Sequence, residues 1–214
     1  RDVYIAIKNI TGHSPKMVWH KDTSLENANL IVLPGGFSHG DYLRSGSIAS
    51  RAPIMKEVIK KAKNGTPVIG ICNGFQILTE CGLLPGALMR NNKMQFICKY
   101  THLVSNYDNT WINKKQLGEV ISLPVAHHDG NYYADDNTIE RLIKDNRIAY
   151  QYCTSAGAIE KSSNINGSTN NIAGIISDKE NVLGMMPHPE RAINTKLGGE
   201  DGIKFFINVF EKLG

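Results

Sequence analysis

A cysteine stands between two glycines in the segment VIGICNGFQ, residues 68–76, directly after an apolar run. Residues 67–71 have the pattern of a buried strand, and residues 73–81 that of a short helix. A cysteine on the tight turn between a strand and a helix has the arrangement of a nucleophile elbow, where glycines let the backbone approach closely. The free N–H groups at the start of such a helix favour a thiolate and can stabilise an oxyanion. Cys72 is therefore a candidate nucleophile, although the same pattern also fits a buried structural cysteine.

Nucleophilic catalysis by a cysteine needs a base and a group that orients this base. Of the seven histidines, His188 stands out because it lies in MMPHPE between two prolines. The proline that follows restricts His188 to an extended backbone, and Glu190 is close enough along the chain to reach the same imidazole. A carboxylate there would fix the tautomer of the ring and stabilise its protonated form. Taken alone, the segment also fits a solvated histidine in a proline-rich turn.

A third segment, VLPGGFSHGDYLR at residues 32–44, would supply backbone N–H groups. A buried strand that ends in Pro34, Gly35 and Gly36 directs these groups to the carboxyl edge of the sheet, where open α/β folds bind their ligands. An oxyanion hole is needed at that place. The segment could also bind phosphate, but it lacks the lysine and the spacing of a P-loop.

The elements that must position these residues form a βαβ unit. Residues 30–34 have the apolar character of a fully buried strand in a parallel sheet. Residues 52–65 carry apolar side chains at helical spacing, with Pro53 at an early helical position and Gly65 as a stop signal. The strand at residues 67–71 follows at once, so the unit is expected to wind right-handed.

The second half of the chain has a different residue composition. Residues 94–106, 148–153 and 171–187 are rich in β-branched and aromatic residues, which favours strands that are partly antiparallel. Residues 161–171 are polar and turn-rich, which is typical of an exposed loop. The last helix is predicted from an apolar stripe that comprises Ile203, Phe206, Ile207, Phe210 and Leu213.

Composition excludes several classes of protein. The 24 Lys and Arg and 20 Asp and Glu residues are spread along the 214-residue chain, which argues against a nucleic-acid binder. The apolar runs are too short to span a bilayer, and no leader opens the chain. The four cysteines, Cys72, Cys81, Cys98 and Cys153, fit no zinc spacing and suit a reducing compartment. We expect one globular, cytoplasmic domain without a metal site or a membrane partner.

With these segments in order, the sequence resembles the class I, or triad, glutamine amidotransferases, and within them the glutaminase subunits of phosphoribosylformylglycinamidine synthase. The resemblance covers essentially the whole chain. It implies a three-layer, flavodoxin-like α/β fold with a mostly parallel sheet, flanking helices and some antiparallel strands, in a single domain over residues 1–214. The segments that carry it are LPGGFSHGDYLRSGSIA, GICNGFQIL, PVAHHDG, NGS with NIAGI, and NVLGMMPHPERA.

The resemblance implies a role for each residue of these motifs. Cys72 would attack the side-chain amide of L-glutamine to form a γ-glutamyl thioester. His188 would move protons to the leaving ammonia and from the hydrolytic water, and Glu190 would orient His188. The backbone N–H groups of Gly36 and Asn73 would hold the oxyanion.

The resemblance also implies a substrate pocket and partners. Gln76 would help to position glutamine, and His127 would line the same pocket. A synthetase subunit would use the ammonia, with ATP and Mg, to convert phosphoribosylformylglycinamide to its amidine, and a small third subunit would bridge the two. This chain carries no ATP motif, and no cofactor is expected on it.

The sequence departs from the family pattern in three places. Family members begin with a strand and a loop before their first helix, whereas this chain opens at RDVYIAIKN. We therefore interpret residues 3–10 as that helix and expect the first strand to be missing from this sequence. His39 stands where the family usually has a tyrosine, and His128 and Asp129 stand where glycine and glutamate are common. Both positions are expected near the mouth of the site.

Two other functions fit parts of the sequence. A cysteine hydrolase or peptidase on a similar α/β scaffold would also use an elbow cysteine, but the early PGGF and the late HPE favour the amidotransferase. An inactive homologue that serves as an assembly partner would not need a nucleophile, a base and an orienting carboxylate, and the chain has all three.

Overall fold

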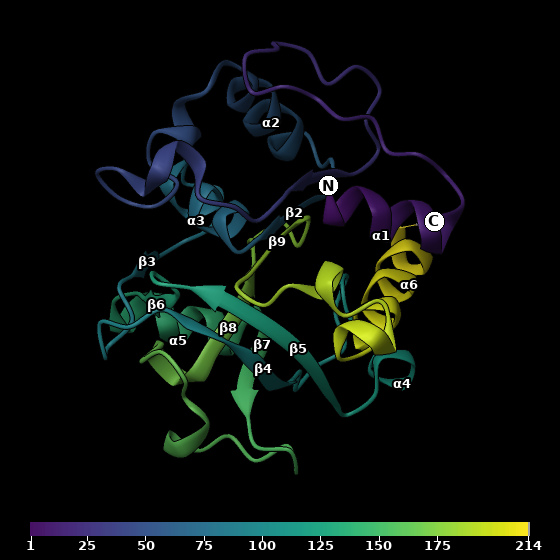
Figure 1. The fold of residues 1–214 in the computed structure, drawn as a ribbon. Helices are drawn as coiled ribbons and strands as arrows, with labels where there is room; N and C mark the ends of the chain where they lie inside the picture. The colour runs from purple at the N-terminus through teal and green to yellow at the C-terminus, as the bar shows by residue number, and fades with distance from the viewer. Residues whose placement is uncertain (214) are drawn as a thin grey trace.

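The computed structural model describes residues 1–213, in which one main sheet is flanked by helices (Figure 1). Within this range the sheet has seven strands in the order β1-β2-β9-β8-β7-β4-β5, and β3 pairs with β6 in a separate ribbon. The strand bounds are β1 Ile31–Leu33, β2 Val68–Ile71, β3 Ala87–Met89, β4 Ile97–Val104, β5 Val120–His127, β6 Asn131–Tyr133, β7 Ile148–Cys153, β8 Ile172–Ile176 and β9 Val182–Met185.

The helices lie on either side of the sheet, with α1 and α6 packed side by side and α3 on the opposite face (Figure 1). In residues 1–213 no helix is long and apolar enough to cross a membrane. The α-helices are α1 Asp2–Thr11, α2 Pro53–Lys63, α3 Asn73–Glu80, α4 Lys114–Leu117, α5 Asp136–Lys144 and α6 Asp201–Leu213. The 3-10 turns are η1 Ser38–Asp41, η2 Ala49–Arg51, η3 Lys161–Ser163, η4 Thr169–Asn171, η5 Pro189–Arg191 and η6 Thr195–Leu197.

The sheet has a parallel part and an antiparallel part. Strands β1, β2 and β9 pair in parallel, whereas the pairs from β9 through β8, β7 and β4 to β5 are antiparallel. Strand direction reverses at each antiparallel pair. Strands β7 and β5 therefore run in the same direction as β1, β2 and β9, and only β8 and β4 run in the opposite direction within this seven-stranded sheet. The α/β class is confirmed, and in strand direction the sheet is mostly parallel, as predicted.

The predicted βαβ unit is present as β1, α2 and β2. Helix α2 starts with Pro53 in its first turn and buries the predicted stripe, which includes Met55 and Val58. Strand β2 is buried along its whole length, as expected for a strand with neighbours on both sides. Strand β1 is only half-buried, contrary to the prediction, because it is the edge strand of the described sheet and pairs with β2 alone.

The predicted stripe of helix α6 is confirmed in part: Phe206 is buried, and Phe210 and Leu213 pack partly buried against the core, but the buried face is turned from the predicted one. The buried side chains include Phe205, Phe206 and Val209, whereas Ile207 is exposed. The same face carries Gly202, where an added Cβ would lie 1.9 Å from the Pro189 carbonyl oxygen. The glycine lets this face of α6 lie close to the Pro189 backbone. This contact places α6 directly against η5.

Residues 161–171 are not the exposed loop that their polarity predicts. The side chains of Asn166, Ser168 and Asn171 are buried. Asn166 donates a hydrogen bond of 2.7 Å from Nδ2 to the carbonyl of Gly130, and Ser168 donates one of 2.7 Å to Asn166 Oδ1. Burial is possible because short amide and hydroxyl side chains satisfy nearby backbone groups. The segment thereby fixes the turn after β5.

Candidate active site

Cys72 lies on the turn between β2 and α3 and is only 5% exposed. Its backbone has φ 51° and ψ −105°, a conformation that is costly for any residue other than glycine. The backbone N–H of Cys72 donates to the Met185 carbonyl on β9 at 2.8 Å, and its thiol faces the Ala126 carbonyl on β5 at 3.7 Å. The first N–H groups of α3 have no partner inside the helix and surround this turn. The predicted elbow geometry is confirmed.

The two glycines beside Cys72 allow α3 to pack against the strands. A Cβ added at Gly74 would lie 2.0 Å from the carbonyl oxygen of Leu33 on β1. A Cβ added at Gly70 would lie 2.4 Å from Leu78 Cδ1. The glycines therefore let the backbone of α3 lie close to the sheet, and this close packing sets the position of the thiol.

His188 and Glu190 form a buried pair next to Cys72. His188 follows β9, and its backbone N–H donates to the Pro124 carbonyl on β5 at 2.8 Å. Its Nδ1 lies 2.6 Å from Glu190 Oε1, and both side chains are almost fully buried. The contact expected from their spacing is confirmed. Within residues 1–213, Nε2 of His188 is buried and has no hydrogen-bond partner, so this nitrogen is the one available for proton transfer.

The glycine loop after β1 lies directly against this group. A Cβ added at Gly35 would lie 2.6 Å from His188 Cε1 and 3.5 Å from Cys72 Cβ. The next residue, Gly36, has space beside it and a φ of 153°. The segments that carry the predicted oxyanion donors, Gly36 and Asn73, therefore both adjoin Cys72. Their role in holding an oxyanion stays a prediction.

Opposing effects act on the charge of His188. Burial disfavours the imidazolium, but its interactions with Cys72 and Glu190 outweigh burial and raise the pKa of His188 to about 9. At neutral pH the ring is therefore protonated in the folded chain. A protonated His188 beside Cys72 can give a proton to a leaving group.

This pKa predicts a pH dependence of stability. A histidine whose pKa is raised on folding, here from 6.5 to about 9, contributes stability in full below the lower value, and this contribution disappears as the pH rises through the higher one. We expect the free energy of unfolding of the parent chain to fall, relative to that of His188→Gln, between these two pH values. Urea unfolding at a series of pH values measures this difference. A difference between the two chains that stays constant over this pH range would contradict the prediction.

Gln76 lies one helical turn after the nucleophile, and protein groups bind both ends of its side-chain amide. Its Oε1 accepts from Asn73 Nδ2 at 2.8 Å, and its Nε2 donates to the backbone carbonyl of Asp129 at 2.7 Å. The structure thus uses Gln76 to join α3 to the turn after β5. Its predicted contact with glutamine stays a prediction.

His127 is buried at the end of β5. The Nδ2 group of Asn91 donates to the carbonyls of Gln95 and His127, which leaves Asn91 Oδ1 to accept from His127 Nδ1 at 3.2 Å. His127 therefore carries its proton on Nδ1. Burial, and then the charge of His188, lower the pKa of His127 to about 4, so the ring is neutral at pH 7. Its role in lining a substrate pocket stays a prediction.

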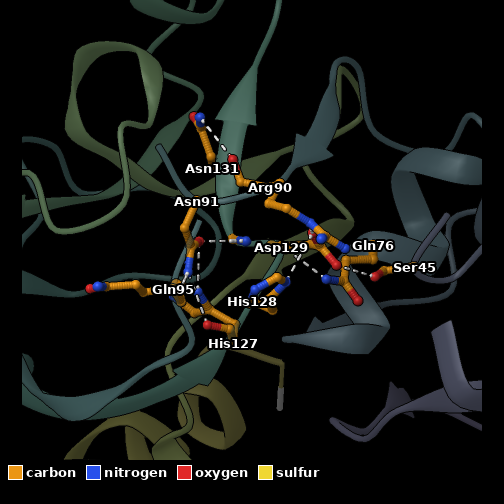
Figure 2. A network of polar contacts seen from close by, with 10 residues as sticks. Ser45, Gln76, Arg90, Asn91, Gln95, His127, His128, Asp129 and Asn131 are labelled. Carbon is orange, nitrogen blue, oxygen red and sulfur yellow. Dashed lines mark hydrogen bonds and ion pairs between the residues drawn. The ribbon is translucent and has the colours of Figure 1, made fainter. Parts of the chain in front are cut away.

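Several residues of the site were not found from the sequence. Ser45, Asn91 and Asp129 belong to a polar network that includes Gln76 and His127 (Figure 2), and the sequence marks Asp129 only as a departure from the family pattern. Their partners are far away in the chain, so spacing gives no signal for them. His39 is exposed on the loop after β1, with its ring 5.8 Å from that of His20. Among residues 1–213 no three histidine, cysteine or acidic side chains are grouped to hold a metal ion.

Comparisons with known proteins identify the family of this chain. Residues 7–198 match the CobB/CobQ-like glutamine amidotransferase domain family. Phosphoribosylformylglycinamidine synthase subunit PurQ of Rhodopseudomonas palustris (strain HaA2) is 52% identical, and the match covers 100% of this chain and 92% of the relative. The subunit of the same name from Rhodospirillum rubrum is 50% identical, with 100% and 94% covered.

Two solved structures extend the comparison. A chain in the structure of PurLQS from Thermotoga maritima has a TM-score of 0.85 and 42% identity, and the match covers 100% of this chain and 92% of that one. A glutamine amidotransferase from Thermotoga maritima has a TM-score of 0.54 and 16% identity, with 89% and 80% covered, and supports the fold alone. This chain belongs to the glutamine amidotransferase family, as one of the glutaminase subunits of phosphoribosylformylglycinamidine synthase.

Proposed function

We propose that this glutaminase hydrolyses glutamine through a triad of Cys72, His188 and Glu190. The observation that carries the proposal is the buried His188–Glu190 pair beside a cysteine that is held at positive φ on a strand-to-helix turn. Strain at a nucleophile, an oriented base and nearby free N–H groups are the parts that acyl transfer requires.

In the first half of the reaction, Cys72 Sγ attacks the side-chain amide carbon of glutamine. The carbonyl oxygen takes up negative charge and accepts from the N–H groups of Gly36 and Asn73. The protonated Nε2 of His188 gives its proton to the amide nitrogen, the C–N bond breaks, and ammonia leaves a γ-glutamyl thioester on Cys72. Glu190 accepts from Nδ1 of His188 throughout, so Nε2 is always the nitrogen that carries the transferable proton.

In the second half, water attacks the thioester carbon while Nε2 of His188 takes a proton from it. The C–S bond breaks, glutamate leaves, and the thiolate and imidazolium are restored. We assign Gln76, one helical turn after Cys72, and His127, at the end of β5, to the binding of glutamine. Neutral His127 can accept a hydrogen bond there while His188 is charged, because their pKa values lie on opposite sides of neutrality.

The ammonia has its use on another subunit. We assign to this chain a synthetase partner, which consumes the ammonia with ATP and Mg, and a small bridging subunit, all in the cytoplasm. An apolar rim on the loop after β1 and on the segment before β4 supports a docking role: its five side chains are exposed although they are large and apolar, and the ring centroids of Phe37 and Phe96, one from each segment, lie 6.2 Å apart. The apolar rim consists of Phe37, Tyr42, Leu43, Met94 and Phe96. A subunit seated there would keep ammonia away from solvent.

The proposal is tested by ammonia release from glutamine, measured on the chain alone and on the chain assembled with its synthetase and small subunits. We expect release that depends on Cys72 and rises on assembly. Absence of release in both samples, with the chain folded, would contradict the proposed function.

The orienting carboxylate can be tested separately with Glu190→Gln. The amide keeps the size of the side chain but cannot stabilise the imidazolium, so we expect kcat for glutamine hydrolysis to fall by roughly 10³- to 10⁴-fold. The pH profile of the remaining activity should shift to lower pH, since Glu190 helps to raise the pKa of His188. The matched control is the exposed Glu200→Gln. A Glu190→Gln variant with parental kcat would remove Glu190 from the triad.

A further inference from the structure

Asp129 lies where three segments of the site meet (Figure 2). It follows His127 and His128 in the turn after β5. The loop after β1 reaches it through Ser45, and the first turn of α3 reaches it through Gln76. The loop after β1 carries Gly36 and helix α3 carries Asn73, and these are the two proposed oxyanion donors.

The carboxylate of Asp129 binds the loop after β1. Its Oδ2 accepts from Ser45 Oγ at 2.8 Å, and Ser45 is 4% exposed. A buried hydroxyl that donates to a carboxylate makes a charge-assisted bond, which is stronger than a neutral one. The other oxygen, Oδ1, lies 3.2 Å from Arg90 Nε, but more than half of Arg90 is exposed, so solvent screens this ion pair. Ser45 is therefore the structurally important partner.

The backbone carbonyl of Asp129 binds the helix of the nucleophile. It accepts from Gln76 Nε2 at 2.7 Å, and Gln76 Oε1 in turn accepts from Asn73 Nδ2 at 2.8 Å. Asn73 directly follows Cys72. One residue thus holds the helix through its main chain and the loop through its side chain.

The loop also packs on the helix without any side chain between them. A Cβ added at Gly46, which has a φ of 81°, would lie 2.8 Å from the backbone of both Gln76 and Ile77. Ser45, the residue before Gly46, is therefore placed at this contact. Its hydrogen bond to Asp129 therefore joins the loop to the turn after β5 at the same place where the loop packs on α3.

The backbone of the loop is strained, so a contact such as the Ser45–Asp129 hydrogen bond is needed to hold its conformation. His39, Asp41 and Leu43 all have positive φ, which costs free energy at each residue. Burial raises the pKa of Asp41, the negative charge of Asp129 adds to that effect, and a hydrogen bond with Ser45 opposes it. Strain and repulsion both favour movement of the loop away from the turn, and the Ser45 hydroxyl opposes them.

We propose that Asp129 is a positioning residue for the glutaminase reaction: its bonds to Ser45 and Gln76 hold the loop of Gly36 and the helix of Asn73 at the separation that an oxyanion requires. This inference rests on the proposed function, because it assigns the oxyanion donors to Gly36 and Asn73. Asp129 itself touches no reacting atom. A small displacement of the donors slows the chemical step more than it weakens substrate binding.

The test is a double-mutant cycle with Ser45→Ala, Asp129→Ala and the double variant, each assembled with the synthetase and small subunits. We expect each single variant to lose roughly 10- to 100-fold in kcat for glutamine hydrolysis with KM changed by less than about threefold. The double variant should be no slower than the slower single variant, because both changes break one link. Ser45→Ala removes a single oxygen atom, so it remains informative if Asp129→Ala assembles poorly.

Two further variants separate positioning from general damage. Asp129→Glu keeps the charge and should restore kcat to within about threefold of the parent, and Arg90→Gln should cost less than about threefold since its ion pair is screened. Ammonia-dependent synthesis should stay at the parental level in every variant. Unchanged kcat in both single variants, losses that multiply in the double variant, or a rise in KM alone would each overturn the positioning role. Ammonia release that survives Cys72→Ala would overturn the proposed function and this inference together.

Discussion

The Cys72→Ala variant, assembled with its partner subunits, should lose glutamine-dependent synthesis by a factor of about 10⁴ or more while it retains ammonia-dependent synthesis. Alanine cannot form the thioester, and the buried site holds no second thiol in the same position: within residues 1–213, Cys81, Cys98 and Cys153 lie elsewhere in the fold. External ammonia bypasses the glutaminase entirely. Synthesis measured with glutamine, and again with an ammonium salt, separates the two activities.

Two controls make this result specific. Cys98→Ala removes the exposed cysteine and should leave both activities unchanged. The mass of the parent chain, trapped in acid during turnover, should increase by one γ-glutamyl group, and Cys72→Ala should show no such adduct. Loss of both activities in an assembled Cys72→Ala complex would refute the division of labour between the subunits.

Gly74→Ala should be the most damaging single methyl group that can be added next to the nucleophile. The new Cβ would lie 2.0 Å from the Leu33 carbonyl oxygen, which belongs to the backbone of β1 and cannot rotate away. Either α3 or β1 must shift, so we expect the free energy of unfolding to fall by more than about 3 kcal/mol. Urea unfolding followed by circular dichroism measures this loss.

Gly199→Ala is the matched control for this prediction. The nearest atom to its added Cβ is Tyr100 Cε1 at 3.5 Å, an ordinary contact distance, and Gly199 does not have positive φ. We expect its effect on the free energy of unfolding to stay below about 1 kcal/mol. Equal losses in the two variants would show that the contact between α3 and β1 is not as close as described.

The triad could be predicted from the sequence because its geometry is local. A strand followed by a glycine-flanked cysteine and a helix leaves the thiol few positions, and a residue two places after His188 lies within reach of its imidazole. The structure has both arrangements, with the His188–Glu190 contact at 2.6 Å. Pro53 and the apolar spacing after it likewise fixed α2, since both signals act within a few residues.

The supporting network could not be predicted because it depends on contacts across the chain. Ser45 and Asp129 are 84 residues apart, and Gln76 and Asp129 are 53 apart. The sequence does not show whether a serine or an asparagine is buried. The segment of Asn166 is therefore predicted to be an exposed loop, although Asn166 is fully buried. The exposure of Ile207 on α6 could not be predicted either, because the buried face is centred on Phe205 and Gly202, where the helix packs against Pro189.

The apolar rim has a consequence for the abundance of this subunit in the cell. A copy without partners presents Phe37, Tyr42 and Leu43 to water, and Leu43 is 90% exposed. Chaperones and proteases act on exposed apolar surface, and self-association begins there as well. Copies without partners would thus be degraded or would aggregate before they could release ammonia that no synthetase subunit takes up. The side chains proposed for docking would in this way tie the amount of the subunit to that of the complex.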